Sequence, residues 1–228
     1  MIYVTGDIHG DISRINVKRF RYHWGENDFV IIAGDCGLLW DNKPTPKELS
    51  LYNWLANQQF TTLFVDGNHE NFTRIKALPV VDYMSGKAHK INDKFYHLMR
   101  GEVYTIQDKK IFTFGGGTSI DKDLRTSFIS WWPDEVFNEE EKQNAYNNLE
   151  KVNYEVDYVI THSGPKSVMP DFPLHMKIYK KPCPVEKFLD ELYKKIKFKY
   201  WFFGHYHYNC DDEPAKCYML YTQIKTLE

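Results

Sequence analysis

The stretch Ile2-Tyr3-Val4-Thr5-Gly6-Asp7-Ile8-His9-Gly10 decides the fold class, because its pattern recurs along the chain. A short run of β-branched and aromatic residues, of strand length, leads directly into glycine and then into side chains that bind metals. Four later runs also end in such side chains, three of them through a glycine, at Gly34-Asp35, Gly67-Asn68-His69-Glu70 and Gly204-His205-Tyr206-His207, and one directly, at Thr161-His162. We therefore predict strands, each followed by a chemically active loop, over 2–5, 29–33, 62–65, 158–161 and 201–203.

Amphipathic stretches separate these runs and predict helices near 12–22, 46–58, 134–150 and 184–196. The segment 95–114 breaks the alternation with three short runs, over 95–99, 103–106 and 111–114, the last two joined by the turn-prone Asp108-Lys109 as in a hairpin. We expect a further strand pair near 201–203 and 217–224. The sequence therefore predicts an α/β fold with mixed sheets. We expect a single domain over 1–228, because no repeat or long linker divides the chain.

Composition excludes several classes of protein. The 29 basic and 31 acidic residues give a net charge of −2, so no global basic field holds nucleic acid or an anionic membrane. No stretch approaches the ~20 apolar residues that span a bilayer, and the first residues lack a signal-peptide pattern, so we expect a cytoplasmic protein. The four cysteines include no C-x-x-C pair, which favours free thiols over disulfides or a zinc site.

The residues that follow the strands are metal-ligand types. The carboxyl ends of strands in an α/β sheet meet at one crevice, so these side chains are expected to converge. Carboxylate oxygens and imidazole nitrogens suit divalent ions such as Mn, Fe, Zn or Co. Asp7 and His9 stand two residues apart, as do His205 and His207, so each pair projects to one side if the backbone is extended. Taken singly, each residue has a structural alternative: Asp7 could cap the following helix, and His162 could be a hydrogen-bonded histidine at a strand end. The joint pattern favours a metal site.

The motifs G-D-I-H-G (6–10), G-D (34–35), G-N-H-E (67–70), T-H (161–162) and G-H-Y-H (204–207) resemble, in this order, those of the calcineurin-like metallophosphoesterases. The glycine-rich segment that follows 111–114 is similar to that of small bacterial and phage-type members. The resemblance implies a four-layer α/β/β/α sandwich with two divalent metal ions between the strand ends, and Mn is the ion expected in vitro. It implies one ion held by Asp7, His9 and His207, a second held by Asn68, His162 and His205, and Asp35 bridging both.

Two cations about 3.5–4 Å apart lower the pKa of a shared water and clamp the oxygens of an in-line displacement. A bridging hydroxide is then the expected nucleophile on a phosphomonoester or phosphodiester. In the family pattern His69 faces the substrate, where it protonates the leaving alkoxide or stabilises its charge. The alternative is a strand-end histidine held by Glu70 or by a backbone carbonyl.

The chain departs from the family pattern at two positions. Protein serine/threonine phosphatases of this superfamily carry G-D-x-V-D-R-G, whose second Asp orients the catalytic histidine and whose Arg binds phosphate. Leu38 and Leu39 stand at those positions here, so this is not a protein phosphatase of that type. The residue that orients His69 stays open among Asp11, Asp41 and Glu70.

The segment 115–132 is expected to select the substrate. Its three glycines, with Thr118 and Ser119, form either an anion-binding nest or a tight strand exit. Arg125 either binds two phosphate oxygens, in place of the arginine whose position Leu39 occupies, or makes a surface salt bridge. Trp131 and Trp132 stack on a base or pack in the core.

We predict a metal-dependent phosphoesterase that acts on a small phosphorylated metabolite or a nucleotide. One alternative is a nuclease acting on DNA or RNA, but nucleases usually need a larger basic groove than the lysines of 194–199 provide. The other alternative is a catalytically idle metal-binding scaffold. No membrane partner is expected, and the sequence identifies no protein partner.

Overall fold

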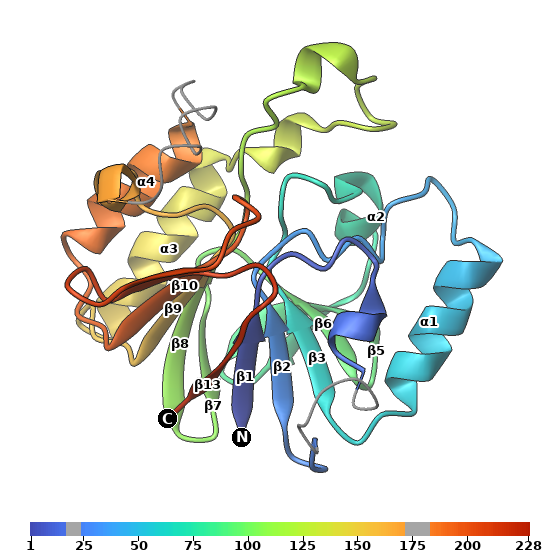
Figure 1. Cartoon of the computed structure of the whole chain (residues 1–228), viewed down its shortest axis with the longest axis horizontal. Helices are drawn as coiled ribbons and strands as arrows, with labels where there is room; N and C mark the ends of the chain where they lie inside the picture. Colours follow the sequence, from blue (N-terminus) through green and yellow to red (C-terminus); the bar gives the residue numbers. More distant parts are fainter. Residues whose placement is uncertain (17–23, 172–182) are drawn as a thin grey trace.

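Figure 1 shows the computed structural model, which describes residues 1–16, 24–171 and 183–228. Two β-sheets lie against each other, and helices cover the outer face of each sheet. These four layers are the predicted α/β/β/α sandwich, and the predicted fold class is confirmed.

The first sheet contains β1 (Ile2–Thr5), β2 (Phe29–Ile32), β3 (Thr61–Phe64), β4 (Val80–Tyr83), β5 (Gly86–Asn92), β6 (Phe95–Leu98) and β13 (Ile224–Leu227). The second contains β7 (Val103–Ile106), β8 (Lys109–Phe114), β9 (Tyr158–Thr161), β10 (Tyr200–Phe203), β11 (Cys210–Asp212) and β12 (Cys217–Met219). Their orders are β13-β1-β2-β3-β6-β5-β4 and β11-β12-β10-β9-β8-β7. In each sheet the middle strands run parallel, and antiparallel neighbours flank them.

The strand β1 shows why these runs are apolar throughout rather than alternating. Ile2 and Val4 pack into the core between the two sheets, whereas Tyr3 packs into the outer core of the first sheet. All three side chains are buried. A strand covered on both faces selects a continuous apolar run, which is the signal in the sequence.

The helices are α1 (Pro46–Ala56) and α2 (Phe72–Lys76) over the first sheet, and α3 (Glu139–Lys151) and α4 (Pro184–Tyr193) over the second. Thr45 caps α1, and Asn138 forms a capping box with Glu141 at the start of α3. That box explains why α3 begins later than the predicted residue 134. Short 3₁₀ turns are η1 (Ile12–Arg14), η2 (Lys122–Leu124), η3 (Pro133–Glu135) and η4 (Lys166–Asp171).

One predicted element needs correction, and the structure adds a hairpin that the sequence analysis did not predict. The helix expected over 12–22 is a single 3₁₀ turn as far as Arg14, and residues 17–22 lie outside the described residues. The strand pair expected near 201–203 and 217–224 is confirmed as the parallel pair of β10 and β12, while β13 lies in the first sheet beside β1. The β4–β5 hairpin was not predicted, because β5 is polar in sequence. The hairpin of β7 and β8 is confirmed.

In the described part of the chain, no helix has the length and apolar character needed to cross a membrane. All four cysteines are free thiols, and three of them are buried.

Candidate metal centre

The loops after five parallel strands meet at one end of the two sheets. The loops after β1, β2 and β3 carry Asp7 and His9, Asp35, and Asn68 and His69, while those after β9 and β10 carry His162, His205 and His207. The side chains of these residues approach one another in two groups that share Asp35. The expected convergence therefore occurs, although the residues span 201 positions of sequence (7 to 207).

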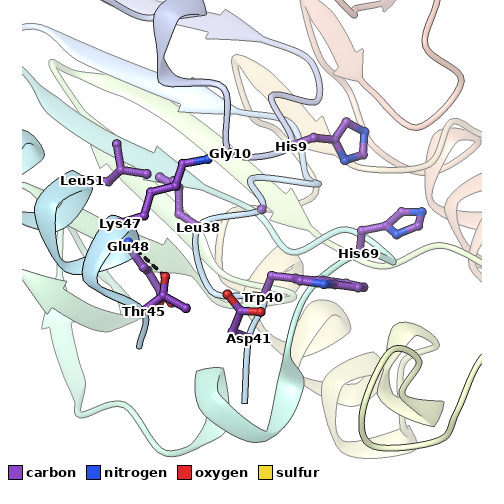
Figure 2. Close-up of a pocket in the computed structure, with 11 residues that line it drawn as sticks. His9, Gly10, Leu38, Trp40, Asp41, Thr45, Lys47, Glu48, Leu51 and His69 are labelled. Atoms are coloured by element: carbon purple, nitrogen blue, oxygen red, sulfur yellow. Dashed lines mark hydrogen bonds between the residues drawn. The ribbon is translucent and has the colours of Figure 1, made fainter. Parts of the chain in front are cut away.

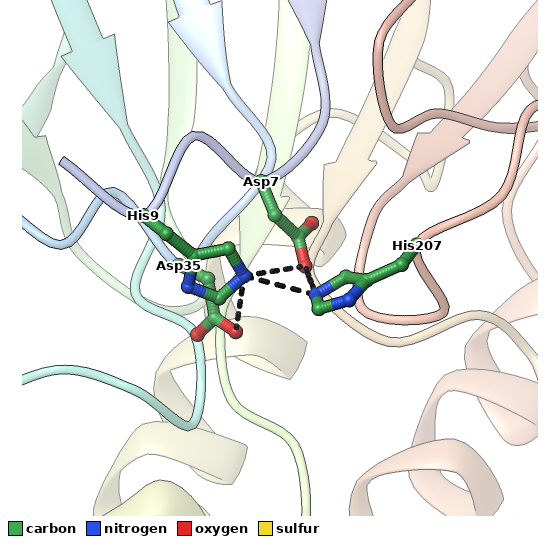
Figure 3. Close-up of side chains that lie close together, drawn as sticks. All are labelled: Asp7, His9, Asp35 and His207. Carbon is green, nitrogen blue, oxygen red and sulfur yellow. Dashed lines mark hydrogen bonds and ion pairs between the residues drawn. The ribbon is translucent and has the colours of Figure 1, made fainter. Parts of the chain in front are cut away.

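The first group consists of Asp7, His9, Asp35 and His207, and Figure 3 shows their side chains pointing toward a common centre. One ligand atom from each lies within 4.8 Å of the others. The Nε2 atoms of His9 and His207 are 2.9 Å apart. The Oδ2 atom of Asp7 lies 3.1 Å from His207 Nε2, and that of Asp35 lies 3.9 Å from His9 Nε2. Both carboxylates are buried, whereas the two imidazoles are partly exposed.

The second group consists of Asn68, His162 and His205, with Asp35 beside them. The Nε2 atom of His162 lies 3.0 Å from Asn68 Oδ1 and 3.2 Å from His205 Nδ1. The same atom is 3.5 Å from Asp35 Oδ1. Since the other oxygen of Asp35 faces the first group, this carboxylate stands between the two groups, as the family resemblance implies for a bridging ligand.

The backbone at these residues is not extended, which corrects the expectation for the Asp-x-His and His-x-His pairs. His9, Asp35, His205 and His207 have φ angles of 46°, 46°, 71° and 50°. This left-handed conformation costs non-glycine residues roughly 1–2 kcal/mol each. The fold holds the first loop in place through Asp35, whose carbonyl accepts hydrogen bonds from the amides of Ile8 and His9. Strain of this kind is concentrated at functional sites.

Two glycines make room for the candidate ligands themselves. A Cβ on Gly67 would lie 2.0 Å from Asp35 Oδ1, and a Cβ on Gly204 would lie 2.1 Å from Asp7 Oδ1. The two glycines let the backbone approach the carboxylates, so any side chain here would displace a candidate ligand.

Burial and neighbouring charge set the electrostatics of both groups. Burial alone would raise the pKa of Asp7, but contact with His207 and the charges of nearby histidines lower it to about 2. Burial raises the pKa of Asp35, and the nearby Asp7 adds to this effect. Burial lowers the pKa of His9 and, further, that of His205, which favours neutral rings with a free lone pair. Contact with Asp7 raises the pKa of His207.

The residues of both groups fit divalent metal ions. The buried Oδ2 atom of Asp7 receives no aligned hydrogen bond from any described residue, although His207 Nε2 lies close to it. Two ring nitrogens, those of His9 and His207, face each other beside it. A buried acceptor without a hydrogen bond, such as Asp7 Oδ2, is costly, and a cation bound here would satisfy it and both ring nitrogens at once. Imidazole nitrogens and carboxylate oxygens suit Mn, Fe, Zn or Co.

A buried hydrogen-bond chain fixes the amide of Asn68. The Nδ2 group of Asn68 donates to Ser119 Oγ over 3.1 Å, and Ser119 Oγ donates to Glu135 Oε2 over 2.6 Å. The Ser119 amide donates to the other oxygen of Glu135. A carboxylate only accepts, so Ser119 must donate to Glu135 and accept from Asn68. The chain therefore turns Asn68 Oδ1 toward His162, where a metal would need it.

Sequence reasoning missed this role of Ser119 and Glu135. The sequence of the glycine-rich loop indicates only a nest or a strand exit. The amides of Gly116 and Gly117 donate to the carbonyls of Asp66 and Glu135, so they are not directed at an anion. The strand-exit interpretation is therefore the one that fits.

His69 lies beside Arg125, which answers a question that the sequence left open. The Nη1 and Nη2 atoms of Arg125 are 3.1 Å and 3.4 Å from the two ring nitrogens of His69. Asp121 binds the other edge of the same guanidinium through Nε and Nη2, both at 2.8 Å. Burial lowers the pKa of His69; Asp35 opposes this shift and Arg125 adds to it.

The three residues first considered as partners of His69 have other positions. Asp11 caps η1, Glu70 accepts a hydrogen bond from the Cys36 amide, and Asp41 lies across a cavity from His69. Leu38 and Leu39 are buried in the outer core of the first sheet, so no side chain replaces the usual aspartate there. Arg125, which contacts His69 instead, comes from the loop after β8.

The two tryptophans of the same loop differ. Trp132 is buried, and its Nε1 donates to Thr73 Oγ1, which fits the core-packing interpretation. Trp131 lies under the ammonium group of Lys122, 5.9 Å from it. The aromatic ring beside His69 is instead Trp40, with ring centroids 5.8 Å apart.

Comparison with known proteins agrees with this geometry. The family model of the calcineurin-like phosphoesterases matches residues 1–209, a span that includes all the candidate ligands, from Asp7 to His207. No curated protein matches the chain significantly. This match suggests phosphoester hydrolysis, with the converged side chains as a possible metal site. The chain belongs to the calcineurin-like phosphoesterase family.

Proposed function

We propose that this protein is a hydrolase that cleaves phosphate esters with the help of two divalent metal ions. The observation that carries the proposal is the position of Asp35, whose two oxygens face two separate groups of ligand-type side chains. One ion would be held by Asp7, His9 and His207, and the other by Asn68, His162 and His205. When bound, the ions supply activation of water and neutralisation of phosphoryl charge.

His69 is positioned to assist departure of the leaving group. Its amide donates to Asp35 Oδ1 over 2.8 Å, which fixes the residue next to the bridging carboxylate. Its ring lines both the cavity above Asp35 and Asn68 and the neighbouring cavity beside Trp40. An ester whose phosphate lies in the first cavity would pass its leaving oxygen close to this imidazole. A hydrogen bond or proton from the ring would then stabilise the developing alkoxide.

Arg125 serves two purposes in this arrangement. It orients the ring of His69, and it places positive charge where the phosphoryl oxygens would lie. Because Asp121 already binds one edge of the guanidinium, the edge that remains is the one facing His69. Nη1 on that edge also donates to the carbonyl of Ser130, so a phosphate would share this edge of the guanidinium with Ser130 and His69.

The size of the site favours small substrates. The cavity next to His9 and His69 measures about 320 Å³, which lies within the range of small-molecule sites. A small phosphorylated metabolite or a nucleotide fills such a space.

Hydrolysis of p-nitrophenyl phosphate and of bis(p-nitrophenyl) phosphate with Mn, Zn or Co tests the proposal. We expect at least one ester to be hydrolysed in a metal-dependent manner. His69→Ala should keep both metals and lose about 10²–10⁴-fold in kcat. Failure of the metal-loaded protein to hydrolyse either ester would support an idle scaffold instead. A wild-type kcat in the His69 variant would remove that residue from the mechanism.

A further inference from the structure

The cavity beside His9 and His69 has a lining that the hydrolysis mechanism does not use. We propose that it binds the leaving group of the substrate and that this group is a guanine nucleoside. The inference rests on the proposed function, because it places the phosphate at the metal centre and the base in the adjacent cavity. Figure 2 shows the residues concerned.

The cavity is continuous with the candidate catalytic residues. His9 and His69 form its inner side, and the loop after β2 together with the start of α1 forms the rest. A phosphate bound near Asp35 would therefore point its ester substituent past His69 into this space. Its volume of about 320 Å³ accommodates one nucleoside rather than a polymer.

The cavity is lined by an aromatic ring and by apolar side chains. Trp40 lies on the same side as His69, with its indole tilted by 42° to the imidazole, and Trp132 packs edge-on against it. Leu38 and Leu51 line the cavity as well. A planar base stacks on an exposed indole face, and this interaction suits every base. Stacking alone therefore selects a nucleoside but not its identity.

The identity follows from two charged groups that have no partner among the described residues. Within the described residues the carboxylate of Asp41 accepts no hydrogen bond, and Lys47 has no ion-pair partner. The other polar groups of the lining are occupied: Thr45 caps α1, and Glu48 binds Arg74. Asp41 and Lys47 are thus the groups available to a ligand.

The backbone holds Asp41 in position even though its side chain is exposed. Its carbonyl accepts hydrogen bonds from Arg74 Nη1 at 2.9 Å and from Asn71 Nδ2 at 3.3 Å. The carbonyl of Trp40 accepts from the same amide of Asn71 at 3.1 Å. The backbone that carries the indole and the carboxylate is therefore held in place before a ligand arrives, which lowers the entropy cost of binding.

Guanine matches this pair of charges better than the other bases do. Its N1–H and N2–H groups are two adjacent donors, and a carboxylate accepts two parallel hydrogen bonds. Its O6 and N7 atoms are acceptors for a lysine. Adenine offers an acceptor at N1 where Asp41 needs a donor, and a pyrimidine offers at most one ring N–H. Asp41 therefore discriminates for guanine by attraction and against adenine by repulsion.

Selectivity among 5′-nucleotides tests the proposal. The specificity constant kcat/KM is measured for GMP, IMP and AMP with the Mn-loaded protein. The same nucleotides are tested as inhibitors of bis(p-nitrophenyl) phosphate hydrolysis, which gives the selectivity if the protein is a diesterase. We expect GMP to exceed AMP by about tenfold or more, with IMP between them because it keeps N1–H and lacks the N2 amino group.

Asp41→Asn should bring the GMP-to-AMP ratio close to one, because an amide cannot accept two hydrogen bonds from the guanine edge. Asp108→Asn is the matched control: Asp108 lies in the remote β7–β8 turn and the ratio should stay at the wild-type value. Trp40→Leu should weaken all three nucleotides by a similar factor, since stacking does not depend on the base.

The outcomes separate this inference from the proposed function. A wild-type ratio near one, or a guanine preference that survives in Asp41→Asn, overturns the guanine assignment while hydrolysis of the p-nitrophenyl esters leaves the proposed function intact. If no ester of any kind is hydrolysed, the proposed function fails, and this inference fails with it.

Discussion

Asp66 and Asn68 stand two residues apart in the loop after β3, yet they belong to two buried polar clusters of opposite character. Asp66 accepts hydrogen bonds from Arg100 Nε at 3.0 Å and Nη2 at 2.5 Å, and its other oxygen lies 3.1 Å from His97 Nε2. Arg100 also binds Glu141. Every charge in this cluster has a partner of opposite charge or a hydrogen bond.

The cluster around Asn68 does not complete itself in this way. In the described part of the chain the buried Oδ2 atom of Asp7 lacks an aligned hydrogen bond, and ring nitrogens of two pairs of histidines lie 2.9 Å and 3.2 Å apart. Four of its backbone residues adopt the left-handed conformation. A buried cluster that satisfies itself stabilises the fold, whereas one that leaves acceptors unpaired needs a ligand. The two clusters therefore predict opposite responses to mutation.

The largest effect is expected from Asp35→Asn. An amide cannot bridge two cations as a carboxylate does, so kcat for p-nitrophenyl esters should fall by about a thousandfold or more. The free energy of unfolding of the metal-free protein should stay the same or rise, because a buried like charge next to Asp7 is removed. Urea denaturation and steady-state kinetics measure the two quantities. A large loss of metal-free stability would show that this cluster is structural.

The reverse result is expected from Asp66→Asn. Arg100 is buried, and removing the partner of a buried charge costs about 3–5 kcal/mol. Urea denaturation of the metal-free protein should show this loss in the free energy of unfolding. An unchanged unfolding free energy would mean that the Asp66–Arg100 pair does not stabilise the fold.

Ser119→Ala should produce a smaller and more selective effect. Without the hydroxyl group, Glu135 no longer fixes the amide of Asn68, so we expect metal affinity to fall about 10–100-fold. Isothermal titration with Mn measures the affinity. Ser119→Thr keeps the hydroxyl group and should restore most of it. Equal affinities in the alanine variant and the wild type would exclude a role for this chain of hydrogen bonds.

The smallest effect concerns pH. Burial alone would raise the pKa of Asp66, but Arg100 and His97 outweigh it and hold the pKa well below its usual range. A carboxyl group with a lowered folded pKa contributes stability above its unfolded value of about 3.9, and this contribution is lost as pH falls through the folded value. Below about pH 4 the wild type should therefore lose stability more steeply than Asp66→Asn. If the free energy of unfolding fell equally with pH in the wild type and in Asp66→Asn, Asp66 would not be charged in the folded protein.

The sequence predicted the positions of the candidate ligands well and their surroundings poorly. Short apolar strands followed by Asp, Asn or His are local signals, and parallel topology brings their ends together, as for Asp7 and His162. The contacts of Ser119 with Asn68 and of Arg125 with His69 join residues 51 and 56 positions apart. No local pattern encodes such pairs, because the packing of one loop on another decides them. The role of the converged residues as metal ligands stays a prediction.

The central claim is that two ions share Asp35. A crystal of the protein soaked in Mn²⁺, with anomalous data collected at the Mn absorption edge, tests it most directly. The account predicts two anomalous peaks per chain, one among Asp7, His9 and His207 and one among Asn68, His162 and His205, with Asp35 contacting both. A single peak, or none at these residues under saturating metal, would contradict it.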